Sequence, residues 1–208
     1  MPRLRIGVVE ARWEERRNRS IKPLFDVLSE LYYSSTHEYE YEMPSTRESF
    51  AECVKRLAGK AGIDVLYVAA HGARNSIQLH GRDAKLTADD LVISLRDANR
   101  TRSNPGISGL FLGTCQFGTE KVAETLLSNV PRLQWVAGYN SDIDFIESSA
   151  LDLLFFNDLL KRRGTPDEKI RRVATYFRKN VARLCARTDV GFSIYVRNQG
   201  EVSDLLSV

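Results

Sequence analysis

The chain has 208 residues, of which 43% are hydrophobic, enough for a substantial core and too many for a disordered polypeptide. Its 30 basic and 27 acidic residues leave a net charge of only +3, which does not indicate a nucleic-acid-binding protein. No apolar run reaches the roughly 18–20 residues of a membrane-spanning helix, and three irregularly spaced cysteines argue against a disulfide scaffold. Because no signal-peptide pattern is visible, we expect one domain over residues 1–208 in a reducing cytoplasm.

Apolar strands alternate with amphipathic helices along the whole chain. The pattern predicts strands at about 3–10, 38–43, 65–70, 110–112, 133–138 and 190–196. It predicts helices at about 20–32, 45–59, 87–95, 120–127, 145–163 and 165–184, with a short hairpin at 76–84 and a surface loop at 97–105. This alternation indicates a mostly parallel central sheet of about six strands with helices on both faces, a three-layer α/β/α sandwich.

Two of these strands end in glycine-flanked residues that can carry chemistry. The apolar strand in Asp64–Gly72 ends in His71-Gly72, and the strand in Ile107–Gly118 ends in a turn of small residues that presents Cys115. Ligands of open parallel sheets gather at the carboxyl ends of the strands. We therefore predict that His71 and Cys115 meet at one edge of the sheet and form a catalytic dyad.

A cysteine and a histidine placed in this way suit acyl transfer. The thiolate attacks a carbonyl carbon, and a neighbouring imidazole can take the thiol proton and return it to a leaving amine. The backbone N–H groups of Gly72 and Cys115 are candidate donors for the oxyanion, since glycine lets the main chain come close to a ligand. The spacing by itself leaves a purely structural pairing of the two side chains open.

Other chemistry-bearing residues have simpler interpretations. His80-Gly81 follows a hairpin segment instead of a buried strand, while Cys53 and Cys185 lie on or after helical apolar stripes and are expected to pack. No spacing indicates a zinc site or a phosphate-binding loop, so no metal or cofactor is expected. Residues 161–187 hold ten Lys or Arg against two acids. This segment could contact nucleic acid or an acidic partner, but a solvated helix face is the preferred interpretation.

With these motifs in this order, the chain resembles the caspase-like (clan CD) cysteine proteases, and it is most similar to their CHAT branch, which is related to separase. The resemblance spans about Arg3 to Val196 and rests on three segments: Leu66–Gly72, Ser76–Leu91 and Val136–Asp144. The residues around the thiol depart from the family patterns. Gly113-Thr114 stand where caspases have Gln-Ala, and Gln116-Phe117 differ from the residues that follow the cysteine in many CHAT domains. These departures put a caspase-type aspartate specificity in doubt.

The resemblance implies a cysteine endopeptidase that acts on a protein substrate without a cofactor. Cys115 would be the nucleophile, His71 the general base and acid, and the amides of Gly72 and Cys115 the oxyanion hole. Asp142, with Asp144 beside it, would line a pocket for an Arg or Lys before the cut; capping of the following helix is the alternative role for Asp144. Small members of this group often act in bacterial antiviral defence and cleave a partner such as a gasdermin-like pore former.

Two other functions stay open from the sequence. One is a catalytically silent caspase-like module that binds a partner protein and keeps the fold without the dyad. The other is a doubly wound domain that binds a small ligand, in which His71 and Cys115 would lie far apart. Neither a membrane nor a nucleic acid is an expected partner.

Overall fold

The computed structural model describes residues 5–12, 19–33, 39–80, 84–100, 106–188, 190–198 and 200–207. Its central sheet contains β1 (Arg5–Glu10), β2 (Glu40–Glu42), β3 (Ile63–Ala69), β7 (Gly109–Gly113), β8 (Trp135–Tyr139), β9 (Phe192–Asn198) and β10 (Glu201–Asp204). The order is β10-β9-β8-β7-β3-β1-β2; the strands from β2 to β8 are parallel, and β9 and β10 add antiparallel pairs at one edge. A second, antiparallel sheet consists of β4 (His71–Ala73), β5 (Ser76–Gln78) and β6 (Lys85–Leu86).

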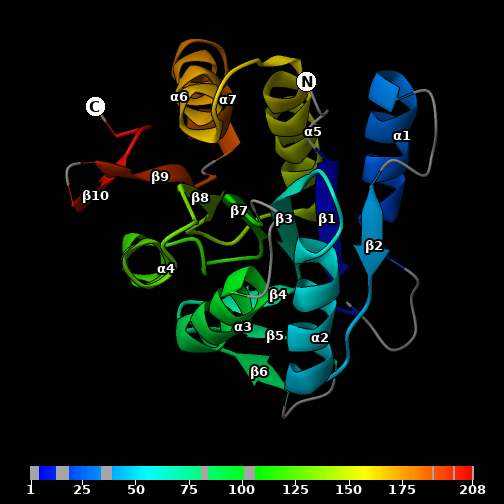
Figure 1. Ribbon diagram of the computed structural model, residues 1–208. Helices are drawn as coiled ribbons and strands as arrows, with labels where there is room; N and C mark the ends of the chain where they lie inside the picture. Colours follow the sequence, from blue (N-terminus) through cyan, green and yellow to red (C-terminus); the bar gives the residue numbers. More distant parts are fainter. Residues whose placement is uncertain are drawn as a thin grey trace.

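Helices cover both faces of the central sheet (Figure 1). One layer consists of α1 (Lys22–Tyr33), α5 (Phe145–Lys161), α6 (Pro166–Tyr176), the π-helical turn η1 (Phe177–Val181) and α7 (Ala182–Thr188). The other consists of α2 (Arg47–Ala58), α3 (Ala88–Arg100) and α4 (Glu120–Asn129). The predicted three-layer α/β/α sandwich with a mostly parallel sheet is therefore confirmed.

Alternate residues of each central strand enter two separate cores. In β3, Leu66 and Val68 pack with α2, α3 and α4, whereas Tyr67 and its neighbours of the same parity pack with α1, α5 and α6. The same alternation divides β7, where Phe111 belongs to the second core and Leu110 and Leu112 to the first. Because both faces are buried, these strands read as continuous apolar runs in the sequence.

The structure differs from the sequence-based expectation at several places. The helix expected at 165–184 is divided into α6, η1 and α7, and the segment expected as a hairpin at 76–84 contributes β5 to the three-stranded sheet. A seventh strand, β10, pairs with β9 in the tail from Arg197 onward, a segment without a clear strand or helix pattern. Helix α3 continues through Arg100, although 97–105 was expected to be a loop. The extension is stabilised by buried Asn99, whose Oδ1 accepts a hydrogen bond from Ile107 N at 3.1 Å. The remainder of that predicted loop, 101–105, lies outside the described residues.

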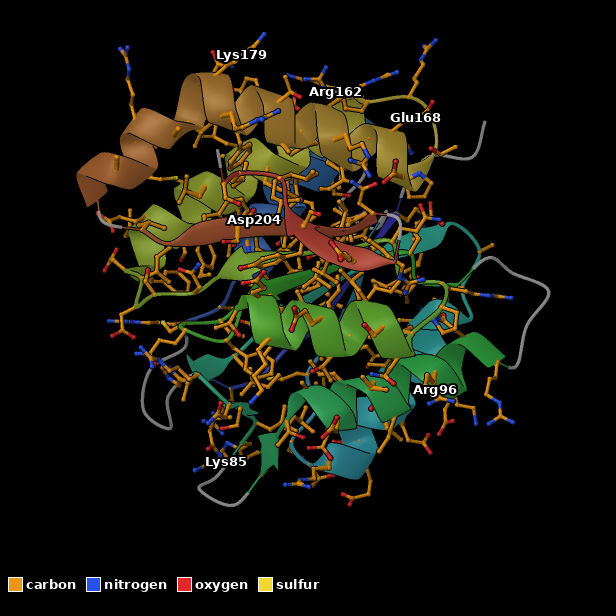
Figure 2. The ribbon with its side chains drawn as sticks, turned by 90° about the vertical axis from the view of Figure 1, so that its left-hand side faces the viewer. Lys85, Arg96, Arg162, Glu168, Lys179 and Asp204 are labelled. Atoms are coloured by element: carbon orange, nitrogen blue, oxygen red, sulfur yellow. The ribbon has the colours of Figure 1, made fainter. Side chains whose placement is uncertain are left out.

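The basic segment 161–187 lies on the outside of the α5–α6–α7 layer. Figure 2 labels Arg162, Glu168 and Lys179 on this outer side, and it shows β9 and β10 between this layer and α4. Two of the arginines form i,i+4 ion pairs, Arg162 with Asp158 at 2.6 Å and Arg171 with Asp167 at 2.9 Å. In the described part of the chain, no helix is long and apolar enough to cross a bilayer.

Candidate active site

The register of the central sheet brings His71 and Cys115 together. The last pair of the β3–β7 ladder is Ala69 opposite Gly113, and His71 and Cys115 each follow two residues later. Gly72 lies against the main chain of Cys115: a Cβ on Gly72 would lie 2.1 Å from the Cys115 carbonyl oxygen and 3.0 Å from its nitrogen. Such a close approach requires glycine. The two strand ends are therefore in direct backbone contact.

His71 and Cys115 line one cavity of about 230 Å³ at the carboxyl edge of the parallel strands. The side chain of His71 is exposed and that of Cys115 is half-buried. The volume is below the roughly 300–1,000 Å³ typical of sites for whole small-molecule ligands, so it suits one side chain of a longer substrate. The other lining residues come from β3, β7 and β8 and from the segments after β1 and β8: Arg19, Ile21, Tyr67, Gly113, Tyr139, Ile143, Asp144, Phe145 and Ser148.

Gln116 and Phe117, the two residues after Cys115, both have structural roles in the turn that follows the thiol. Gln116 has φ = 58°, the left-handed conformation that costs an L residue roughly 1–2 kcal/mol. Two bonds to the loop after β8 hold it there: Gln116 N donates to Ser141 O at 3.0 Å, and its Nε2 donates to Asp142 Oδ1 at 2.8 Å. Phe117 is fully buried in the core. Both residues therefore fix the turn that carries the thiol.

The thiol faces the loop that follows β8. Cys115 Sγ lies 3.8 Å from the carbonyl oxygen of Ile143, within the range of a weak S–H donor. Gly118 packs against the same region, since a Cβ there would lie 2.6 Å from Tyr139 N. The thiol turn and the loop after β8 thus form one unit.

The structure gives the two predicted pocket acids different surroundings. Asp144 lines the cavity and also caps α5, because its Oδ1 accepts from Ile146 N at 2.7 Å and from Glu147 N at 3.4 Å. The capping role is therefore seen, whereas the binding of a basic side chain by Asp144 stays a prediction. Asp142 is not among the described residues that line the cavity, and its carboxylate accepts the side-chain hydrogen bond of Gln116. The geometry thus favours Asp144, not the preferred Asp142, as the acid of the pocket.

Two buried carboxylates near the cavity were not identified from the sequence. Asp152 of α5 is fully buried and accepts hydrogen bonds from Tyr67 and Tyr139, each at 2.5 Å. Burial raises its pKa to about 7, although the two tyrosine hydrogen bonds act in the opposite direction. In the sequence, an acidic residue between Leu151 and Leu153 of an apolar helix is the feature that could have identified Asp152.

Glu10 is the second of these carboxylates, and it ends β1 with its side chain fully buried. It accepts hydrogen bonds from Ser20 Oγ at 2.6 Å, from Ile21 N at 2.8 Å and from the Tyr41 hydroxyl. This anchor brings the returning chain to the cavity, where Arg19 forms part of the wall. Arg19 itself is exposed and lies outside any helix or strand, and residues 13–18 lie outside the described part of the chain.

The other cysteines and the second histidine lie elsewhere. Cys53 is buried beside the Glu42–Arg56 ion pair, at a separate hollow of about 360 Å³. Burial raises the pKa of the Cys53 and Cys185 thiols, which disfavours their thiolate forms. His80 is exposed after β5 and does not line the cavity, and Gly81 lies outside the described residues. Among the described residues, no group of three or more His, Cys, Asp or Glu could hold a metal ion.

Comparison of the structure with solved structures shows the caspase-like fold of the C11 cysteine proteases. The chain is similar to a secreted C11 cysteine protease from Bacteroides thetaiotaomicron in complex with an irreversible peptide inhibitor, with a TM-score of 0.58, 10% identity, and coverage of 92% of this chain and 66% of that one. It is also similar to a structure of the C11 protease called iotapain from the same organism, with a TM-score of 0.50, 10% identity, and coverage of 99% and 67%. No family model and no curated protein matches the sequence. The chain thus spans about two thirds of the proteases whose fold it shares.

Proposed function

We propose that the chain is a cysteine endopeptidase whose nucleophile is Cys115 and whose general base and acid is His71. The observation that carries the proposal is that both side chains line one cavity at the ends of adjacent parallel strands, with Gly72 against the main chain of Cys115. The caspase-like fold shared with C11 cysteine proteases supports the same reaction class. The narrower likeness to the CHAT branch remains a prediction.

The chemistry follows from the two side chains. His71 takes the thiol proton, and Cys115 Sγ attacks the peptide carbonyl to give a tetrahedral oxyanion, for which the amides of Gly72 and Cys115 are the proposed donors. The intermediate collapses to a thioester as His71 gives the proton to the leaving amine. A water molecule then attacks the thioester while His71 takes a proton from it, and the proton returns to the sulfur as the acid product leaves.

The cavity beside the dyad would bind the side chain that precedes the scissile bond. Its carboxylate is Asp144, and the capping bonds of that residue both use Oδ1. Asp144 is exposed at the cavity, and its carboxylate would favour a side chain rich in hydrogen-bond donors, such as arginine or lysine. We therefore propose cleavage after a basic residue. Asp142 contributes indirectly, by bracing the thiol turn through Gln116.

Reactivity of the thiol tests the catalytic assignment. An acyloxymethyl-ketone peptide with arginine at its reactive end should label Cys115 far faster than Cys53 or Cys185. Cys115→Ala should lower peptide turnover by roughly 10³-fold or more, while Cys53→Ala and Cys185→Ala serve as matched controls. If all three cysteines react equally slowly and no peptide is cleaved, the chain is instead a catalytically silent caspase-like module that binds a partner.

The biological setting that we propose is a cytoplasmic defence effector that cleaves a partner protein such as a gasdermin-like pore former. It rests on the family resemblance of the sequence. Co-expression with a candidate pore former, followed by detection of a fragment that depends on Cys115, is the test. A cleavage site without a basic residue before the cut would contradict the proposed specificity.

A further inference from the structure

Beneath the cavity, a buried carboxylate is clamped between two tyrosines from different strands. Asp152 of α5 is fully buried; its Oδ2 accepts from the Tyr67 hydroxyl of β3, and its Oδ1 accepts from the Tyr139 hydroxyl of β8, each at 2.5 Å. These two strands flank β7, which carries Cys115. Asp152 therefore links the two strands on either side of β7, the strand that precedes Cys115.

The hydroxyl ends of both tyrosines lie next to the cavity. Tyr67 and Tyr139 belong to its lining. A Cβ on Gly113, another lining residue, would lie 2.2 Å from the Tyr67 hydroxyl oxygen. The Tyr139 hydroxyl lies 3.1 Å from the carbonyl oxygen of Ser148, which also lines the cavity. The two tyrosines thus form the floor of the cavity, and the buried Asp152 lies behind them.

The direction of these hydrogen bonds determines what the floor can bind. A phenol has one proton, and an ionised carboxylate accepts without donating. The Tyr67 proton is directed to Asp152, and the Tyr139 proton is shared between Asp152 and the Ser148 carbonyl, so both hydroxyl oxygens offer lone pairs to a ligand. The Asp144 carboxylate is a further acceptor among the lining residues. A guanidinium or ammonium group, which carries several donors and no acceptor, complements such a surface.

We propose that Asp152, acting through Tyr67 and Tyr139, is a second specificity determinant that selects a cationic side chain in the cavity. The inference rests on the proposed function for its meaning as substrate selection. Asp152 is a positioning residue: it fixes the hydrogens of the tyrosines and does not itself contact the substrate. The hydrogen bonds described for Asp152 come from hydroxyl groups and include no cation, so a guanidinium bound nearby would favour the ionised form of Asp152.

Arg19 should have the opposite effect to Asp152 on the binding of a cationic side chain. It lies on the cavity wall, held there by the bonds of its neighbours Ser20 and Ile21 to Glu10. Its positive charge opposes that of a cationic ligand. Removal of Arg19 should therefore increase selection for a cation, whereas neutralisation of Asp152 should decrease it. A purely structural role of Asp152 does not predict this pair of opposite effects.

The test compares peptides that differ only in arginine or neutral citrulline before the cut. Asp152→Asn should lower the arginine-to-citrulline ratio of kcat/KM by about tenfold or more, mainly through KM, because a hydrogen-bond network to a charged group is lost. Arg19→Ala should raise the ratio. Asp158→Asn, on the same helix and paired with Arg162, is the matched control and should leave the ratio unchanged. An unchanged ratio in a folded Asp152→Asn protein would overturn the inference.

Direct binding separates this inference from the proposed function. Calorimetry with butylguanidinium and its neutral analogue butylurea, on Cys115→Ala, needs no turnover. Preferential binding of the cation, weakened about tenfold by adding Asp152→Asn, supports the inference even if no peptide is cleaved. Equal binding of both probes, or binding of neither, overturns it whatever the peptidase assay shows. Should Asp152→Asn fail to fold, Tyr139→Phe removes one floor acceptor and must weaken cation binding in the same direction.

Discussion

Replacing Gly72 with alanine would test whether backbone contact between the two strand ends positions the dyad. The new Cβ would lie 2.1 Å from the Cys115 carbonyl oxygen, whereas ordinary contact begins near 3.4 Å, so one strand end must move by about 1.3 Å. A displacement of about 1 Å at a reacting group can reduce the rate by on the order of 100-fold, equivalent to about 2.7 kcal/mol in the barrier. Overpacking should also destabilise the fold by about 1–3 kcal/mol.

The assay is kcat/KM on an arginine peptide, together with the rate of Cys115 alkylation and the thermal unfolding midpoint. Gly7→Ala is the matched control, because its Cβ would lie 3.2 Å from the end of the Leu57 side chain, which can yield, in a strand distant from the thiol. We expect Gly7→Ala to affect stability more than activity. A folded Gly72→Ala protein with unchanged kcat would refute the idea that this contact sets the geometry of the dyad.

Three further predictions concern acids and a hydroxyl near the site. Asp152 keeps its proton in the folded state up to about pH 7 but loses it near pH 4 when unfolded, so the free energy of unfolding should fall by about 4 kcal/mol as pH rises through this window. Denaturant titrations should show that Asp152→Asn removes this slope; an equal slope in the variant would contradict the raised pKa. Asp144→Ser preserves the helix cap and should keep the unfolding midpoint while reducing turnover of arginine peptides about tenfold, whereas Asp144→Ala should also lose about 1 kcal/mol of stability. Equal turnover of arginine peptides by wild type and Asp144→Ser would argue against Asp144 as the pocket acid. Thr114→Val replaces a buried hydroxyl that lacks a hydrogen-bond partner among the described residues, so the variant should be as stable as wild type or more so; a loss above about 1 kcal/mol in chemical unfolding would mean that the hydroxyl has a partner.

The alternation of apolar strands with helices was enough to predict the layers of the fold. This pattern did not predict elements that are polar and are stabilised by particular hydrogen bonds. The Glu-Val-Ser-Asp segment of β10 has a single apolar residue and gains its structure from pairing with β9. The end of α3 was taken for a loop because the bond between Asn99 and Ile107 that stabilises it cannot be recognised from composition.

Only the residues at the ends of the apolar strands could be predicted as site residues from the sequence. His71 and Cys115 follow apolar runs and precede or follow glycines, so their patterns were visible. Tyr67 and Tyr139 lie within such runs and resemble ordinary core residues. The partner of Tyr67 lies 85 residues away, on a helix whose position depends on the whole fold. The sequence could therefore predict the reacting groups but not the polar floor beneath them.

The contact between Gly72 and Cys115 has a consequence for sequence searches that look for chains with this fold. The relation of Gly72 to the Cys115 carbonyl, and of Gly118 to Tyr139, joins main chain to main chain. Gly138 makes a similar contact, since a Cβ there would lie 2.7 Å from the Leu112 carbonyl oxygen. A few glycines thus set how closely these strand ends meet. This explains how a fold can be shared at 10% identity while no family model matches the sequence. A search keyed to the spacing of these glycines and the thiol should find relatives that residue similarity overlooks.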